Sequence, residues 1–353
     1  MNESPIAPDA SFEYYRGEIY WNNFNIVNEH HNRIITGQKD KSWIWDLRNR
    51  LKDERAFLLN CGNGWVERDL FKAGVIKSAA GCDINQQLLD LAKNEANAIG
   101  LDAEYFCVDV NTMDAPDDTF GLVVNFAAMH HVAFINRTME ILSRATGTNG
   151  HYVSYDYVGP HRNQYSTEAW FACEKTRLSL PEKYRTILRY PHIRTMLSSD
   201  PSEAVHSELE EEVQDRYFSR IKSTRLGGAL LYPILYGNKR LFQDQDTPEG
   251  REALHFLIEE DCNFLKNHPE TNLFTFSICK SKRSTINESQ VNEWQEEENI
   301  RESISTHHDG RYYSATGLEL IYNVFYDRED SLKADLASAI KTQNRLEEGV
   351  ELQ

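Results

Sequence analysis

A turn with two glycines follows an apolar run near residue 60, where a backbone could approach a ligand closely. Residues 60–64 include Gly62 and Gly64, and glycine lets the chain turn tightly with no Cβ between the backbone and a bound group. The dinucleotide-binding fingerprint is incomplete, because Glu67 takes the place of its third glycine. This pattern is typical either of a nucleoside-binding site or of a tight turn without a ligand.

Two carboxylates follow the next two predicted strands. Asp83 ends the second strand, where an acidic side chain can accept hydrogen bonds from both ribose hydroxyls of a nucleoside cofactor. It could instead cap the helix that follows. Asp109 ends the third strand, where it could bind an adenine amino group. The turn and both carboxylates fall at consecutive strand ends, and these converge on the edge where open α/β sheets bind ligands.

Two adjacent histidines, His130 and His131, come just after the fourth predicted strand. An imidazole with a pKa of about 6.5 can take a proton from a hydroxyl or an ammonium group. Because adjacent side chains point in different directions, we expect only one of the two to face the pocket. The alternative is that one packs under the sheet and the other caps the turn.

Further polar residues follow the fifth predicted strand on the same edge. Asp156 could orient an acceptor or a histidine, and the planar fork of Arg162 could clamp a carboxylate or phosphate, or pair with a nearby glutamate. Residues 200–203 predict a helix start with proline in its first turn, and contact with the substrate is the alternative for this segment. The predicted catalytic residues are His130, His131 and Asp156. The residues predicted to contact the substrate are Tyr157, His161, Arg162 and Gln164.

Short apolar runs alternate with helical patterns through the middle of the chain. This order predicts parallel strands joined by helical crossovers, and therefore an α/β fold with a doubly wound, mostly parallel sheet. The predicted strands are residues 56–59, 79–83, 103–108, 121–126 and 151–155, with a late strand at 273–279. The predicted helices include residues 42–51, 66–72, 85–98 and 135–143.

Four regions follow from these shifts in composition: an N-terminal helical lid (1–55), a cofactor-binding core (56–155), a mostly helical acceptor-binding region (156–283) and a C-terminal extension (284–353). The N-terminal aromatics, Tyr14, Tyr15, Tyr20 and Trp21, could cover a cofactor or pack in the core. The extension opens with a Glu-rich stretch, yet it is too apolar later to be a disordered tail. We expect it to dock on the catalytic domain, a second copy or a partner protein, and to end in an amphipathic helix near residues 332–340.

The composition excludes several classes of function. Of 353 residues, 38 are Lys or Arg and 55 are Asp or Glu, so the net charge of −17 argues against a nucleic-acid substrate. The chain has no apolar stretch of about 18 residues and begins without a basic, apolar leader, which predicts a cytoplasmic protein without a membrane span. Six scattered cysteines predict reduced, buried thiols. The histidine pairs are adjacent, without helical ligand spacing, so the sequence predicts no metal site.

The glycine turn, Asp83, Asp109 and the fourth strand occur in the order and spacing of the class I S-adenosylmethionine-dependent methyltransferases, which this chain resembles. The resemblance implies a Rossmann-like methyltransferase fold and S-adenosyl-L-methionine as cofactor, with the turn facing its methionine, Asp83 its ribose and Asp109 its adenine. Asn60 stands where the first glycine of the turn is usual, and Asn tolerates positive φ best among other residues. The cofactor contacts expected on this basis are Asn60, Cys61, Gly62, Gly64, Asp83, Ile84, Asp109, Val110 and Phe126.

Three later motifs look like a bacterial subgroup often associated with polysaccharide or secondary-metabolite clusters. They are residues 129–132, 155–164 and 200–205. The chain has Asp156 where that pattern usually has a glutamate, and Asn163 where it has an aromatic. This resemblance spans roughly residues 12–283.

The sequence therefore predicts an S-adenosylmethionine-dependent methyltransferase that acts on an oxygen or nitrogen of a small molecule or glycan precursor. Such chemistry needs the acceptor held in line with the methyl group and a proton removed, because the sulfonium leaving group supplies the driving force. One alternative is a methyltransferase-like binding or scaffold subunit. Another is a nicotinamide-dependent oxidoreductase, against which the missing third glycine and the acid at the third strand both count.

Overall fold

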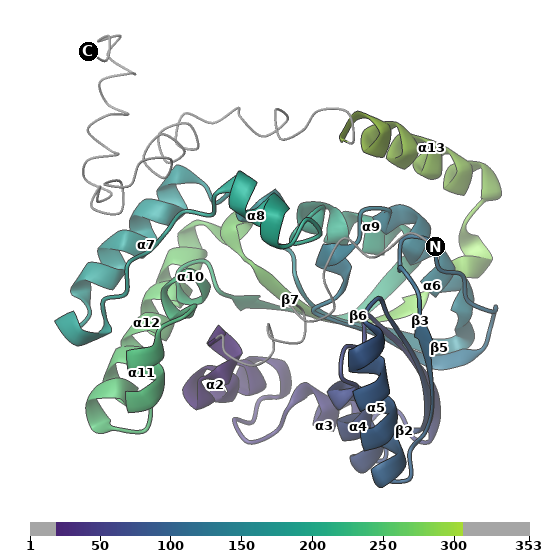
Figure 1. The fold of residues 1–353 in the computed structure, drawn as a ribbon, viewed down its shortest axis with the longest axis horizontal. Coiled ribbons are helices and arrows are strands. Elements are labelled where there is room, and N and C mark those ends of the chain that lie inside the picture. The colour runs from purple at the N-terminus through teal and green to yellow at the C-terminus, as the bar shows by residue number, and fades with distance from the viewer. Residues whose placement is uncertain (1–18, 306–353) are drawn as a thin grey trace.

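A seven-stranded sheet forms the centre of the protein, in a computed structural model that describes residues 19–305. The strand order is β3-β2-β1-β4-β5-β7-β6 (Figure 1). The strands are β1 (Glu54–Leu59), β2 (Ile76–Asp83), β3 (Asp102–Cys107), β4 (Phe120–Phe126), β5 (Thr146–Tyr157), β6 (Phe218–Gly227) and β7 (Phe274–Ser281). The first five pair in parallel, whereas β7 runs antiparallel to both β5 and β6. The predicted doubly wound α/β fold is confirmed.

Helices cover both faces of this sheet. The α-helices are α2 (Asn25–Thr36), α3 (Trp43–Arg48), α4 (Trp65–Lys72), α5 (Gln86–Ala98), α6 (Ile135–Ala145), α7 (Thr167–Ser179), α8 (Ile193–Ser199), α9 (Glu210–Tyr217), α10 (Leu231–Leu235), α11 (Lys239–Asp244), α12 (Pro248–Asn267) and α13 (Glu288–Ser305). The 3₁₀ turns are η1 (Trp21–Asn23), η2 (Met129–His131), η3 (His161–Asn163), η4 (Glu182–Tyr184), η5 (Ser207–Leu209), η6 (Pro269–Thr271) and η7 (Arg283–Thr285). In the view of Figure 1, α3, α4 and α5 lie below the sheet, and α9 and α13 lie above it.

Both faces of the sheet are apolar, and successive residues of β1 show why. Ala56 and Leu58 join the core on the face of α4 and α5, whereas Phe57 and Leu59 join the core on the face of α6 and α9. Side chains of a strand alternate between faces, so a strand buried on both faces is apolar throughout. The strand order reverses between β1 and β4, and ligands of open α/β sheets bind at that switch point, outside the carboxyl ends of the strands.

One strand, β6, is missing from the sequence prediction, which treats residues 156–283 as mostly helical before the late strand. It pairs only with β7 at the edge of the sheet, and its residues alternate between partly buried and exposed. Charged side chains occupy its partly buried face; Lys222, for example, binds Asp46 at 2.9 Å. Edge strands often carry such charges, and these mask the apolar pattern by which a strand is recognised.

The predicted helix start at residues 200–203 is wrong. Asp200 instead caps the C-terminal end of α8, and the chain then turns until η5. Tertiary partners take the backbone groups that a helix would use: the Arg162 N–H donates to the Ala204 carbonyl at 2.7 Å, and the Val205 N–H to the His130 carbonyl at 3.0 Å. These contacts hold an irregular loop, residues 200–206, against η2.

Helix α13 forms most of the C-terminal extension that the structure describes, and it packs against α6. Glu298 accepts hydrogen bonds from the backbone N–H groups of Asn136 and Arg137, at 2.5 and 2.9 Å. These are orphan donors at the start of α6, where the capping position holds the apolar Phe134. Glu302 binds His206 at 2.6 Å. The predicted terminal helix near 332–340 lies outside the described residues.

The structure also tests the predictions for the N-terminal aromatic residues and for the cysteines. Trp21 is buried and packs on Phe274 with ring centroids 4.3 Å apart, so it belongs to the core; Tyr14 and Tyr15 lie outside the described residues. All six cysteines are free thiols within residues 19–305; four are buried, Cys262 is half-buried and Cys107 is exposed. None of the helices in this part of the chain is long and apolar enough to cross a membrane.

Candidate functional site

The glycine turn after β1 adopts a left-handed backbone at three positions. Asn60 has φ 42°, Gly62 has φ 55° and Gly64 has φ 73°. Asn60 thus adopts the positive φ for which asparagine is the best substitute for glycine. The Cys61 N–H donates to the Cys82 carbonyl at 2.8 Å, which fastens the turn to the end of β2.

Gly64 leaves room for a buried acid beneath the turn. A Cβ at this position would lie 2.7 Å from Glu67 Oε1 and 3.0 Å from the Tyr105 hydroxyl. Glu67 is fully buried and accepts a hydrogen bond from Tyr105 at 2.9 Å. Burial raises the pKa of Glu67 to about 6. The residue that interrupts the dinucleotide fingerprint therefore supports the turn from inside.

Asp83 lies at the end of β2 with both carboxylate oxygens directed at backbone N–H groups. Its Oδ2 accepts from Gly62 and its Oδ1 from Asn85, each at 2.9 Å. Burial raises the pKa of Asp83, and these hydrogen bonds oppose the shift. The capping role is filled by Asn85, whose side chain accepts from the N–H groups of Gln87 and Leu88 at the start of α5. A carboxylate has about four acceptor sites, so Asp83 retains capacity for ligand hydroxyls.

The loop after β3 places Asp109 at the surface and Val110 in the core. Asp109 Oδ1 accepts from the backbone and side-chain nitrogens of Asn111, at 2.9 and 3.0 Å. Asn111 in turn accepts hydrogen bonds from the N–H groups of Ala133 and Phe134. This chain of contacts ties the predicted adenine-side loop to the segment that follows η2.

Phe126, at the end of β4, belongs to an aromatic cluster beside the turn. Its ring lies 4.9 Å from that of Trp65 and 5.2 Å from that of Tyr155, measured between centroids. Trp65 follows Gly64 directly and is 40% exposed, as Ile84 after Asp83 is 41% exposed. Large apolar side chains that remain accessible next to a polar turn suit the non-polar parts of a nucleoside cofactor.

His130 is oriented by Asp156. Its Nδ1 lies 2.5 Å from Asp156 Oδ1, and the other oxygen, Oδ2, accepts from the N–H groups of Ala128 and Met129 at 3.0 and 2.7 Å. Burial lowers the pKa of His130, but the Asp156 carboxylate outweighs burial and raises this pKa to about 9. Of the two roles predicted for Asp156, the structure favours the orientation of a histidine.

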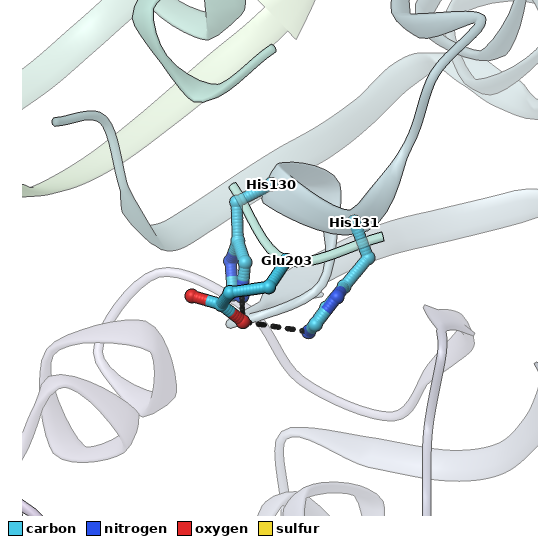
Figure 2. Close-up of side chains that lie close together, drawn as sticks. All are labelled: His130, His131 and Glu203. Atoms are coloured by element: carbon cyan, nitrogen blue, oxygen red, sulfur yellow. Dashed lines mark ion pairs between the residues drawn. The ribbon is translucent and has the colours of Figure 1, made fainter. Parts of the chain in front are cut away.

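His131 points to the same place as His130, from a different anchor. Its Nδ1 lies 3.1 Å from the Ser202 hydroxyl, which donates to Asp200 at 2.6 Å. The Nε2 atoms of both histidines lie 3.8 Å from Glu203 Oε2 (Figure 2). The expectation that the two side chains point apart is therefore wrong, because each ring is anchored through Nδ1 by a separate partner.

Glu203 is not among the predicted site residues, because the helix start was preferred over substrate contact for residues 200–203. The motif at residues 200–205 was the available signal, but its proline and acids resemble a helix start. Arg162 holds this loop: its buried guanidinium donates to the carbonyls of Pro201 and Glu203, at 2.5 and 3.0 Å. Through these bonds Arg162 positions Glu203, and no glutamate side chain among the described residues forms the salt bridge that the sequence left open for it.

A cavity of about 530 Å³ lies beyond β5, and the predicted substrate residues Tyr157, His161, Arg162 and Gln164 are not among the residues that line it. Its lining includes residues 158–160, directly after the buried Tyr157, and Tyr165, directly after Gln164. Gln164 donates to the Arg162 and Pro191 carbonyls, and His161 lies 3.9 Å from Glu208 in the cavity wall. The charged residues of the lining are Glu168, Glu208, Glu211, Glu270 and Arg225.

The predicted cofactor residues and the histidines share one edge of the sheet. The Asn60 side chain donates to the Ala128 carbonyl at 3.3 Å, which joins the glycine turn to the residue before η2. His131 is close enough to Asp83 to lower the pKa of that carboxyl group, against the effect of burial. A ligand on the turn would therefore lie next to the His130–His131–Glu203 cluster.

The doubly wound sheet, the glycine turn after β1 and the acid after β2 are the features by which the chain resembles the class I S-adenosylmethionine-dependent methyltransferases. Residues 59–154 match the family model described as a methyltransferase domain, which confirms the resemblance over this segment. The ubiquinone biosynthesis O-methyltransferase of Coxiella burnetii is 29% identical over 82 residues, 23% of this chain and 34% of that protein. The chain thus spans about a third of the length of the curated relatives it matches.

Solved structures with a similar arrangement include an S-adenosylmethionine-dependent methyltransferase from Mesorhizobium loti, at 16% identity and a TM-score of 0.42, over 68% of this chain and 99% of that one. Another is the geranyl diphosphate C-methyltransferase of Streptomyces coelicolor A3(2), at 11% identity and a TM-score of 0.41, over 67% and 73% of the two chains. The predicted bacterial subgroup stays a prediction.

Proposed function

We propose that this protein transfers the methyl group of S-adenosyl-L-methionine to an oxygen or nitrogen of a small molecule or glycan precursor. The observation that carries the proposal is the contact between Asn60 and the Ala128 carbonyl, which brings the predicted cofactor turn and the histidine cluster together. The methyltransferase-domain match over residues 59–154 supports the choice of cofactor.

The residues of the turn and strand ends fit such a cofactor. Its sulfonium supplies an electrophilic methyl group and a neutral leaving group. Asp83 has remaining acceptor capacity for ribose hydroxyls, and the exposed Ile84 and Trp65 offer apolar contact. The exposed Asp109 could accept from the adenine amino group.

The acceptor would meet the methyl group at the histidine cluster, next to the glycine turn. Transfer requires the nucleophile to be held in line with the methyl carbon and to lose a proton. His130, held by Asp156, together with His131 and Glu203, would orient the acceptor and favour its deprotonated form.

Calorimetry with S-adenosylmethionine, S-adenosylhomocysteine and NAD(P)⁺ tests the cofactor. We expect both sulfur compounds to bind one per chain and the nicotinamide nucleotides to give no heat. Binding of NAD(P)⁺ without a response to the first two would favour the oxidoreductase alternative instead.

Methyl transfer is tested separately, by incubating the protein with a cell extract and cofactor carrying an isotopically labelled methyl group, and then identifying labelled metabolites by mass spectrometry. Cofactor binding without any labelled product across small-molecule and glycan fractions would favour a binding or scaffold subunit. The control is the Asp83→Ala variant, which should label less of the same product.

A further inference from the structure

We propose that His130, His131 and Glu203 form a binding site for a divalent transition-metal cation such as Zn²⁺, next to the methyl-donor site. Figure 2 shows the two imidazoles and the carboxylate directed at one another. Their ligand atoms all lie within 4.8 Å of one another, and Glu203 Oε2 is 3.8 Å from each Nε2. These distances are too long for hydrogen bonds, so the three polar atoms surround a common point without binding each other there.

The distances between the two Nε2 atoms and Glu203 Oε2 suit three ligands of one metal ion. Zinc lies about 2.0–2.2 Å from nitrogen and oxygen ligands, so two ligands of one ion are roughly 3.4 Å apart at the tetrahedral angle and farther apart as that angle opens. Two histidines and one carboxylate are a donor set that zinc and other transition metals use when coordination positions stay open.

The outer contacts of both rings are those of metal-binding histidines. Such histidines generally use the second ring nitrogen to bind a carboxylate, a carbonyl or water, which fixes the tautomer and aims the ligand nitrogen. His130 Nδ1 meets the fully buried Asp156 at 2.5 Å, and His131 Nδ1 meets the Ser202 hydroxyl at 3.1 Å. Both Nε2 atoms are thereby left to face Glu203.

The surroundings favour a cation. Besides Glu203, the carboxylates of Asp156 and Asp200 lie within ion-pair distance of the two rings, at 2.5 Å from His130 and 3.9 Å from His131. Their combined negative charge attracts a divalent ion, and the His131 side chain, 27% exposed, leaves the site accessible from solvent.

A second histidine–carboxylate cluster provides a comparison. His161, His206 and Glu208 also lie within 4.8 Å of one another, but His206 Nε2 already binds Glu302 at 2.6 Å. Glu208 is exposed, so its substitution is a matched control that leaves the proposed site intact.

A cation in this position also indicates the kind of acceptor, an inference that rests on the proposed methyl transfer. Metal coordination lowers the pKa of a bound hydroxyl group, which favours an oxygen nucleophile over a nitrogen one. The acceptor would lose its proton to solvent and its oxygen would bond to the methyl carbon, while the carbon–sulfur bond breaks with both electrons passing to sulfur. No oxidant or reductant is needed.

The test uses the full chain, treated with a chelator and then dialysed into metal-free buffer. Titration with ZnCl₂ in a calorimeter should give one ion per chain. Glu203→Gln should weaken this binding roughly tenfold or more, whereas Glu208→Gln should leave it unchanged. Thermal unfolding of both variants checks that they fold, and Co²⁺ absorption on the same proteins reports nitrogen ligation directly.

Absence of stoichiometric Zn²⁺ binding, or equal weakening by both variants, would overturn the proposed site. S-adenosylmethionine titrated into the same chelated protein separates the two proposals. Cofactor binding without Zn²⁺ binding would reject the metal site alone, and Zn²⁺ binding without cofactor binding would reject the proposed methyl transfer alone.

Discussion

The Asp83 carboxylate accepts a hydrogen bond from the Gly62 N–H at 2.9 Å, so the end of β2 fastens the turn after β1. One side chain therefore shapes the predicted cofactor site and is also the predicted acceptor of hydrogen bonds from the ribose of the cofactor. Its removal should affect binding through both routes.

We predict that Asp83→Ala weakens S-adenosylmethionine binding by about 1–3 kcal/mol, the typical loss when charge-assisted hydrogen bonds are removed. Calorimetry on the folded variant measures this change. Asp90→Ala, an exposed substitution on the neighbouring α5, is the control and should bind normally. Wild-type affinity in Asp83→Ala would limit Asp83 to a structural role.

Substitution in the histidine cluster should lower the rate of methyl transfer without changing the affinity for the cofactor. His131→Ala is expected to lower methyl transfer roughly 100-fold, the scale of a lost proton-transfer or activating group, because its Nε2 faces Glu203 at the meeting point of the site. The dissociation constant of S-adenosylmethionine should stay within about twofold. Single-turnover assays with labelled cofactor measure the rate, and unchanged turnover would remove His131 from the mechanism.

Asp156 should contribute strongly to stability. It is fully buried and accepts hydrogen bonds from the backbone of Ala128, Met129 and Tyr157 as well as contacting His130. Breaking a buried ion pair on one side typically costs about 3–5 kcal/mol, so Asp156→Ala should lower the free energy of unfolding by that order. Urea denaturation measures it. A loss below about 1 kcal/mol would contradict the role assigned to this carboxylate.

Glu67 should make stability depend on pH. Its pKa is raised from 4.5 to about 6 in the folded protein, so the folded state binds more protons than the unfolded state between these values. The free energy of unfolding therefore falls as pH rises through this window, by about 2 kcal/mol. Glu67→Gln cannot titrate, so its stability relative to wild type should improve by that amount between pH 4 and pH 7. A constant difference between the two proteins would refute the shift.

Glu298 should stabilise the fold from outside the catalytic core. It caps the start of α6 through two backbone N–H groups, so Glu298→Ala should cost about 1–2 kcal/mol in urea denaturation. The matched control is Glu297→Ala, an exposed neighbour on α13.

Truncation of the chain after Arg283 should lower the free energy of unfolding more than Glu298→Ala does, while S-adenosylmethionine still binds. Loss of cofactor binding with unchanged stability would show that the extension serves the site instead.

Strands β1, β2, β4 and β5 were predictable because each contains an apolar run buried on both faces and is separated from the next strand in the chain by a helix or loop, whereas the edge strand β3 is mostly exposed. The register of Ala56, Phe57, Leu58 and Leu59 on alternate faces follows directly from such a run. The glycine turn and Asp83 were also predictable from local sequence. Glycine and asparagine are the residue types that adopt positive φ, and Asp83 directly follows an apolar run. The sequence pattern of strand β6 is harder to recognise, because its partly buried face carries charged side chains whose partners come together only in the folded protein.

What the sequence determined by itself is the set of local preferences: apolar runs that become strands, glycines and Asn60 that turn the chain, and the acids at strand ends. Only the tertiary structure decided that Glu203 faces both histidines. Its loop has no regular structure of its own, and Arg162, from a distant turn, holds it by the carbonyls of Pro201 and Glu203. Contacts between segments far apart in the chain lower the entropy of the chain, and only the interactions of the complete fold offset this loss. A local sequence pattern therefore could not predict them.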